Sequence, residues 1–166
     1  YSSAASDVYK RQINNDGDCN YFIARSYVGH GRRYLNPPCG RDIIFNSIMV
    51  DWDEPVILVE GVFDAIVVGD NAIPILGSTL REDSRLFQAL AIHDTPVFVA
   101  LDPDAEKKAR WIIRSLMKYD LEVKKINLEH YEDIGAMSRE VFLEKLKNAE
   151  EVDGDMYWLE KQLKNI

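Results

Sequence analysis

Two short apolar runs, each ending in acidic residues, constrain this chain more than any other feature. Residues 56–59 are all apolar and lead directly into Glu60. Residues 97–101 form a second apolar run, which leads into Asp102 and Asp104 on either side of a proline. A short, continuous apolar run is typical of a strand that is covered on both faces. The pattern therefore predicts two buried strands that carry carboxylates at their C-terminal ends.

Helical and strand patterns alternate along the rest of this part of the chain. We expect strands at residues 56–59, 72–76, 97–101 and 122–128, and helices at residues 62–68, 79–91, 105–119 and 138–149. Alternation at this spacing implies a parallel sheet with right-handed crossovers. We therefore predict an α/β, Rossmann-like fold with a parallel sheet of about four strands flanked by helices. In such sheets ligands bind at the carboxyl ends of the strands, where both acidic groups fall.

The chain is expected to contain four segments. Residues 1–12 match what one frame of a common transposon sequencing adapter encodes, so we interpret them as an artefact and exclude them from the fold. Residues 13–55 carry several arginines and are expected to form a basic N-terminal subdomain. Residues 56–150 form the main domain, and residues 151–166 form a C-terminal helix or linker. Because the chain does not begin with Met, we expect it to be a fragment of a longer protein.

Charge and cysteine content narrow the class of protein. The net charge of −8 argues against a protein that coats nucleic acid with a uniformly basic face, but it allows an enzyme with a local basic patch. Cys19 and Cys39 lack partners at zinc-ligand spacing, so we expect free thiols in a reducing compartment. No apolar run approaches the ~20 residues that cross a bilayer. We expect a cytoplasmic protein (in the host cytoplasm if phage-encoded) that has no membrane partner.

The carboxylates at the predicted strand ends are expected to have a stabilising partner, because burying an unpaired carboxylate costs free energy. Glu60, Asp102 and Asp104 are expected at one rim of the sheet, and Asp133 lies in the loop after the fourth predicted strand. Clustered oxygen ligands suit Mg²⁺ or Mn²⁺, which usually also bind substrate phosphates. The alternative for any single acid is a surface position or a helix cap. Asp104, for example, is placed to cap a helix that starts at Ala105.

Two motifs give these acids a family resemblance. Residues 59–65 (VEGVFDA) and 100–104 (ALDPD) resemble the two motifs of the Toprim domain, which occurs in DnaG-like primases, topoisomerases, some nucleases and recombination proteins. The resemblance extends over roughly residues 56–149. Residues 33–37 (RYLNP) are similar to the Lys-Tyr-Leu-Asn-Ser segment that precedes this domain in bacterial primases. Residues 76–80 (LGSTL) are similar to their Leu-Gly-Thr-Ala-Leu segment. The Tyr-Leu-Asn segment favours a primase over the other members.

This resemblance to bacterial and phage primases implies an activity and a set of site residues. The implied activity is Mg²⁺- or Mn²⁺-dependent synthesis of RNA primers from NTPs on a single-stranded DNA template during replication. The implied metal ligands are Glu60, Asp102, Asp104 and Asp133, and the implied catalytic residues are Glu60 and Asp64. The residues expected to bind nucleic acid or nucleotide are Arg25, Arg32, Arg33, Tyr34, Asn36, Lys107 and Lys108. A replicative helicase, possibly fused in the parent protein, is the expected partner, and zinc is expected only in an upstream domain.

The chain departs from the primase pattern at one place, and two other functions stay open. Primases usually place Ala-Gly shortly after the second aspartate, whereas Asp104 is followed by Ala105, Glu106 and two lysines with no glycine. One alternative is a Toprim nuclease of the overcoming-lysogenization type, which would use the same carboxylates to hydrolyse DNA. The other is a non-catalytic Toprim module that binds nucleic acid or a partner. The compact layout and the missing glycine favour a phage origin.

Overall fold

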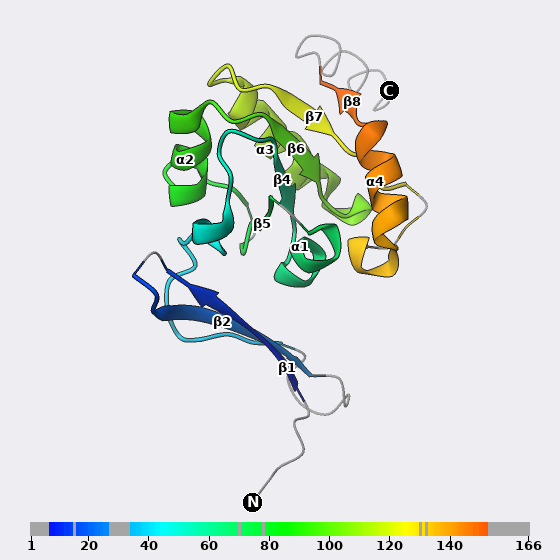
Figure 1. Ribbon diagram of the computed structural model, residues 1–166. Helices are drawn as coiled ribbons and strands as arrows, with labels where there is room; N and C mark the ends of the chain where they lie inside the picture. Colours follow the sequence, from blue (N-terminus) through cyan, green and yellow to red (C-terminus); the bar gives the residue numbers. More distant parts are fainter. Residues whose placement is uncertain are drawn as a thin grey trace, which may run out of the picture.

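The computed structural model describes residues 7–14, 16–26, 34–69, 71–77, 79–129, 131 and 133–152. These residues form two separate sheets (Figure 1). The smaller sheet is antiparallel, has the order β1-β2-β3 and consists of β1 (Asp7–Ile13), β2 (Cys19–Ser26) and β3 (Tyr34–Leu35). In Figure 1 its two long strands form a twisted ribbon below the larger sheet.

The larger sheet confirms the α/β prediction and extends it by one strand. Its order is β5-β4-β6-β7-β8, with β4 (Val56–Val59), β5 (Ala72–Pro74), β6 (Val97–Ala100), β7 (Val123–Lys125) and β8 (Glu150–Glu151). The pairs among β5, β4, β6 and β7 are parallel, as predicted. The additional strand, β8, pairs with β7 in antiparallel orientation at the edge.

Helices cover both faces of this sheet, and the side chains of β4 show how. The helices are α1 (Val62–Val68), α2 (Arg85–His93), α3 (Glu106–Met117) and α4 (Arg139–Lys147), with short 3-10 turns η1 (Ser47–Met49), η2 (Pro103–Ala105) and η3 (Ile134–Ala136). Val56 and Leu58 join the core with α2 and α3 on one face. Ile57 and Val59 join the core with α1 and α4 on the other. All four side chains are buried, which explains the continuous apolar run.

Several predicted elements begin or end at different residues. Helix α2 begins at Arg85 rather than at residue 79, because the hydroxyl of Ser84 caps it by accepting the Phe87 amide. The strand predicted at 72–76 ends at Pro74, and Leu76 adopts a left-handed φ of 56° that a strand cannot contain. The strand predicted at 122–128 is shorter and covers only Val123–Lys125.

The termini bear on two further predictions. The prediction excludes residues 1–12 from the fold. In the structure, however, residues 7–12 belong to β1 and pair with β2. This pairing does not bear on the adapter origin of the segment, which stays a prediction. The helix or linker predicted at the C-terminus lies almost wholly outside the described residues, which end at residue 152. Among the described helices, none has the length and apolarity that crossing a membrane requires.

Candidate active site

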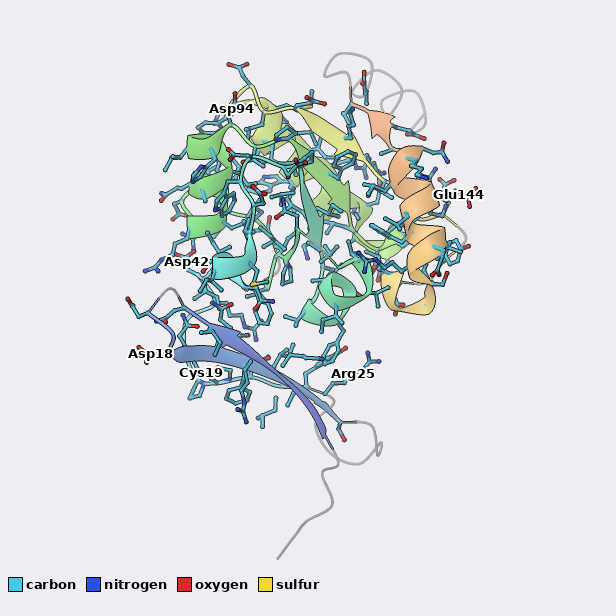
Figure 2. The ribbon with its side chains drawn as sticks, in the orientation of Figure 1. Asp18, Cys19, Arg25, Asp42, Asp94 and Glu144 are labelled. Carbon is cyan, nitrogen blue, oxygen red and sulfur yellow. The ribbon has the colours of Figure 1, made fainter. Side chains whose placement is uncertain are left out.

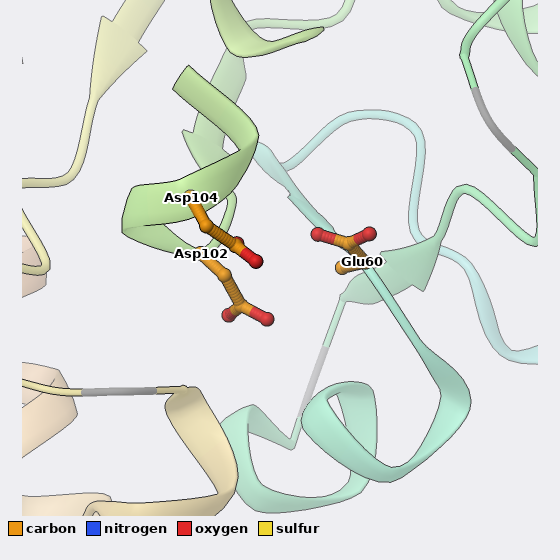
Figure 3. A group of neighbouring side chains, drawn as sticks. All are labelled: Glu60, Asp102 and Asp104. Carbon is orange, nitrogen blue, oxygen red and sulfur yellow. The ribbon is translucent and has the colours of Figure 1, made fainter. Parts of the chain in front are cut away.

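The acidic residues at the strand ends converge. Strand β4 pairs with β6 in parallel, with Val59 opposite Ala100, so the residues that follow both strands emerge at the same edge. Glu60 follows β4, whereas Asp102 and Asp104 belong to the turn that leads from β6 into α3 (Figure 3). One carboxylate oxygen from each of these three residues lies within 4.8 Å of the others. The geometry therefore groups the three acids that the two motifs single out.

These carboxylates have oxygen atoms that the protein does not satisfy. Glu60 Oε2 and Asp102 Oδ1 are buried and accept no hydrogen bond within the described part of the chain. Burial raises the pKa of Asp102 from 3.8 to about 6, and neighbouring carboxylates add to the rise. In decreasing order of effect these are Asp64, Glu60, Asp133 and Asp104. Oxygens that are crowded, buried and mutually repelling are stabilised by a cation, so the group fits a hard divalent ion such as Mg²⁺ or Mn²⁺.

Asp64 lies in the first turn of α1 and has a clear structural role. Its Oδ2 accepts a hydrogen bond from the backbone amide of Gly61 at 2.9 Å, which closes the N-terminus of the helix. Burial raises the pKa of Asp64, and the hydrogen bond from Gly61 opposes the rise. Asp64 also lines the cleft in front of the acidic group. Its predicted catalytic role therefore stays a prediction, beside a capping role that the structure shows.

Asp133 lines the same cleft but is not part of the group of three. It caps η3, where its Oδ1 accepts the amide of Ala136 at 2.8 Å. Its negative charge contributes to the raised pKa of both Asp64 and Asp102, which places it electrostatically close to the site. Its predicted role as a metal ligand stays a prediction.

The two lysines at the start of α3 have different surroundings. Lys108 Nζ lies 3.2 Å from Glu60 Oε1 and 3.1 Å from the carbonyl oxygen of Gly77, and only 14% of its side chain is exposed. Lys108 therefore pairs with a carboxylate of the acidic group and does not extend freely into solvent. Lys107 is exposed and does not line the cleft. The predicted contact of both lysines with a triphosphate stays a prediction.

A cleft of about 700 Å³ separates the acidic group from the N-terminal sheet. The sheet side of the cleft is lined by Arg25 from β2, by Tyr34 from β3 and by Asn36, whose Oδ1 is buried without a partner in the described structure. Figure 2 shows Arg25 at the end of β2 that lies below α1, and Asp18 and Cys19 at the other end. The predicted Arg32 and Arg33 lie outside the described residues.

Arg25 is held by aromatic rings from both halves of the molecule. Its guanidinium carbon lies 5.7 Å from the ring centroid of Tyr34 and 5.7 Å from that of Phe63, the second residue of α1. The two rings are themselves 6.3 Å apart. Cation–π contacts of this kind contribute about 0.5–1 kcal/mol at exposed sites. The stack fixes a positive charge at the mouth of the acidic cleft.

Phe63 and Arg41 are among the cleft residues that sequence reasoning missed. Phe63 stands inside the VEGVFDA motif, between Gly61 and Asp64, so its position next to the site could have been inferred from the motif alone. Arg41 also lines the cleft, together with Leu76 and Gly77. It belongs to the basic N-terminal region, but nothing in the sequence distinguishes it from the other arginines there.

Comparison with known proteins finds solved structures that have a similar fold. No family profile and no curated protein matches the sequence. The Escherichia coli primase catalytic core matches 97% of this chain at 16% identity with a TM-score of 0.75, over 57% of its own length. A DnaG primase catalytic domain bound to ssDNA matches 88% of this chain at 18% identity and a TM-score of 0.71, over 52% of its length.

The zinc-binding and RNA polymerase domains of the Aquifex aeolicus primase match 89% of this chain at 22% identity with a TM-score of 0.66, over 41% of their length. The chain thus spans about half of the length of the solved primases that it resembles. The similarity covers both sheets of this chain, and the identities are low in each case. The fold of this chain matches about half of a DnaG-type primase catalytic core, and its five-stranded sheet with flanking helices has the Toprim fold of these proteins.

Proposed function

We propose that this chain forms the catalytic centre of a DNA primase, which makes RNA primers from NTPs on single-stranded DNA. The observation that carries the proposal is the group formed by Glu60, Asp102 and Asp104, which faces Arg25 and Tyr34 across one cleft. A carboxylate group that fits a divalent ion, opposite a wall with a cation and an aromatic ring, suits a triphosphate and a nucleic-acid strand. The similar structure of a DnaG domain bound to ssDNA supports this choice of template.

The acidic group would hold the metal. Bound by Glu60, Asp102 and Asp104, Mg²⁺ or Mn²⁺ would neutralise the triphosphate and the charge that develops as a 3′-hydroxyl attacks in line. Lys108 holds Glu60 Oε1 and leaves Oε2 available as a ligand, so the carboxylate is oriented before any substrate enters. Asp102 has to lose its proton, with a pKa of about 6, before it binds a cation well.

The opposite wall would position the nucleic acid. The guanidinium of Arg25 supplies a phosphate contact, which fixes the strand without reading its sequence. Tyr34 and Phe63 flank that guanidinium and offer ring faces on which a base stacks. Asn36 has an unsatisfied buried carbonyl oxygen in the same wall, which suits a hydroxyl or amino group of the nucleotide. Arg32, Arg33 and Lys107 are proposed as further phosphate contacts.

One assay separates this proposal from its rivals. The protein is incubated with single-stranded DNA, labelled NTPs and MgCl₂, and the products are resolved on a denaturing gel. We expect short labelled RNA that disappears in Glu60→Gln and in Asp102→Asn, while Asp53→Asn, an exposed aspartate outside the cleft, retains synthesis. Shortened DNA without RNA products would establish the nuclease instead.

A binding measurement covers the case in which no product of either kind forms. Mn²⁺ binding is followed by electron paramagnetic resonance in the wild type, in Glu60→Gln and in Asp53→Asn. The proposal requires a Mn²⁺ site that the Glu60 substitution weakens and the Asp53 substitution leaves intact. If no such site exists, the chain is a non-catalytic module and the proposal is wrong.

A further inference from the structure

A second pocket lies beside the acidic cleft. It has a volume of about 370 Å³ and is formed by residues 40–43, by the segment after β5 and by the start of α2. Pockets of about 300–1,000 Å³ are typical of sites for small organic ligands. None of the functional residues predicted from the sequence lines this pocket, so the proposed primase site does not account for it.

The pocket and the cleft share a wall. Arg41, Leu76 and Gly77 line both cavities, so a ligand in one lies next to a ligand in the other. Lys108 ties this wall to the acidic group, because its ammonium contacts both the Gly77 carbonyl oxygen and Glu60 Oε1. The position of the wall and the position of the carboxylate are therefore fixed by the same side chain.

The wall contains a strained residue. Leu76 is 9% exposed and has a φ of 56°, a left-handed conformation that costs a leucine about 1–2 kcal/mol. Its side chain packs with Tyr21, Phe45 and Val62 in a small core below the wall, which holds the backbone in this conformation. Strain of this kind persists where surrounding packing over-determines it, and it is common at ligand sites.

The chemistry of the pocket suits a nucleotide. Its lining is apolar at Ile43, Ile75, Leu80 and Leu86, which offers a surface for a base. Thr79 adds a hydroxyl to this lining.

One cation of the pocket is available to a phosphate. Two arginines and two aspartates line the pocket, so its formal net charge is zero. Asp83 pairs with Arg81, and Asp42 Oδ1 accepts the backbone amide of Arg85 at 2.9 Å. Arg41 has no ion-pair partner among the described residues, so the cation that lies between the two cavities is available to a phosphate.

We propose that this pocket binds the nucleotide that starts the primer, beside the triphosphate in the cleft. This inference rests on the proposed primase function, because joining two nucleotides requires both of them to be held at the metal. The 3′-oxygen of the pocket nucleotide would bond to the α-phosphorus of the triphosphate. The bond from that phosphorus to the oxygen of the β-phosphate would break, pyrophosphate would leave and the hydroxyl proton would pass to solvent.

The test measures binding without catalysis. The cleft is first saturated with Mn²⁺ and α,β-methylene-ATP, an analogue that cannot react at its α-phosphorus. AMP is then titrated in, and its binding is measured by calorimetry. We expect one additional equivalent of AMP to bind. Thr79→Trp, which fills the pocket, is expected to weaken AMP binding at least fivefold. Arg81→Ala leaves the Asp83 carboxylate without its cation in the pocket lining, so repulsion of the AMP phosphate is expected to weaken binding by a similar factor. Both variants are expected to bind α,β-methylene-ATP like the wild type.

Two substitutions that neighbour the pocket without lining it serve as matched controls. Gln88→Trp and Arg85→Ala lie on the exposed side of α2, and both are expected to bind AMP like the wild type. Circular dichroism and thermal unfolding establish whether each variant is folded. If Thr79→Trp does not fold, the comparison of Arg81→Ala with its control still tests the proposal.

The two proposals fail in different ways. If the cleft-saturated protein binds no AMP, or binds it equally well in Thr79→Trp and Arg81→Ala, the second site is refuted and the primase proposal is untouched. If α,β-methylene-ATP and Mn²⁺ do not bind in the first step, the primase site itself is refuted, and the inference that rests on it falls too.

Discussion

Replacing Asp102 with asparagine is expected to stabilise the metal-free protein while it destroys the site. Burial and four neighbouring acids raise the pKa of Asp102 from 3.8 to about 6. Between these two values the folded protein binds a proton that the unfolded chain does not, so the free energy of unfolding falls as the pH rises from about 4 to about 6. Above this range the loss is complete. Asparagine never ionises, so Asp102→Asn avoids the loss.

The size of the effect follows from the pKa. One pKa unit corresponds to about 1.4 kcal/mol, so the rise to about 6 sets a ceiling of about 3 kcal/mol. Asp102 is partly exposed to the open cleft and its neighbours are screened by solvent, which reduces the expected gain to about 1–2 kcal/mol at pH 7.5. Mg²⁺ at about 100 times its Kd would add about 2.7 kcal/mol to the wild type and little to the variant.

Urea unfolding of both proteins tests this directly. In EDTA at pH 7.5 we expect Asp102→Asn to be the more stable, and at pH 4 we expect the two curves to coincide. MgCl₂ at pH 7.5 should reverse the order. Asp53→Asn removes the same charge from an exposed turn, so it should follow the wild type under all three conditions. If Asp102→Asn is the less stable protein in EDTA at pH 7.5, the electrostatic argument for the metal site is wrong.

Three further predictions follow from the packing and from the charges. Lys108→Met should lower the free energy of unfolding in EDTA by about 1–2 kcal/mol, because it leaves Glu60 without its cation, and the exposed Lys107→Met should change it by less than about 0.5 kcal/mol. Phe142→Ala removes a fully buried ring and should cost about 3–5 kcal/mol, seen as a lower urea midpoint. Arg25→Ala should weaken the binding of labelled single-stranded DNA in fluorescence anisotropy and reduce its log–log salt slope by about 0.7, whereas Lys147→Ala on α4, outside the cleft, should not.

The core of the larger sheet was predictable because burial alone determines its pattern. Val56–Val59 is apolar at every position, since helices cover both faces of β4, and the prediction matches the strand residue for residue. The end of β5 was not predictable in this way. Ile75 and Leu76 are also buried and apolar, so they continue the pattern, but a positive φ at Leu76 turns the chain away from the sheet. Hydropathy carries no information about φ.

The acidic group was predictable and the opposite wall largely was not, for a topological reason. Glu60 and Asp102 follow strands that pair in register, so local pattern and the rules for parallel sheets bring them together. Arg25 reaches the site only because β2 pairs with β3 and the small sheet docks beside α1, which no local pattern indicates. The resemblance of the segment around Tyr34 to primases predicted that Tyr34 binds nucleic acid or nucleotide. The contact between the rings of Tyr34 and Phe63 depends on tertiary packing and was not predicted.

The missing glycine after the second aspartate does not weaken the case for the site. A glycine is required where the backbone adopts a positive φ, and no residue from Asp102 to Lys108 does so. Ala105 and Glu106 have φ values of −88° and −54°, which any residue adopts, as the chain passes from η2 into α3. Two ion pairs then fix the start of α3, since Glu106 Oε2 lies 2.6 Å from Lys125 Nζ and Lys108 binds Glu60. The segment without glycine thus presents both aspartates to Glu60, and Lys108 from the same helix turn keeps that glutamate in place.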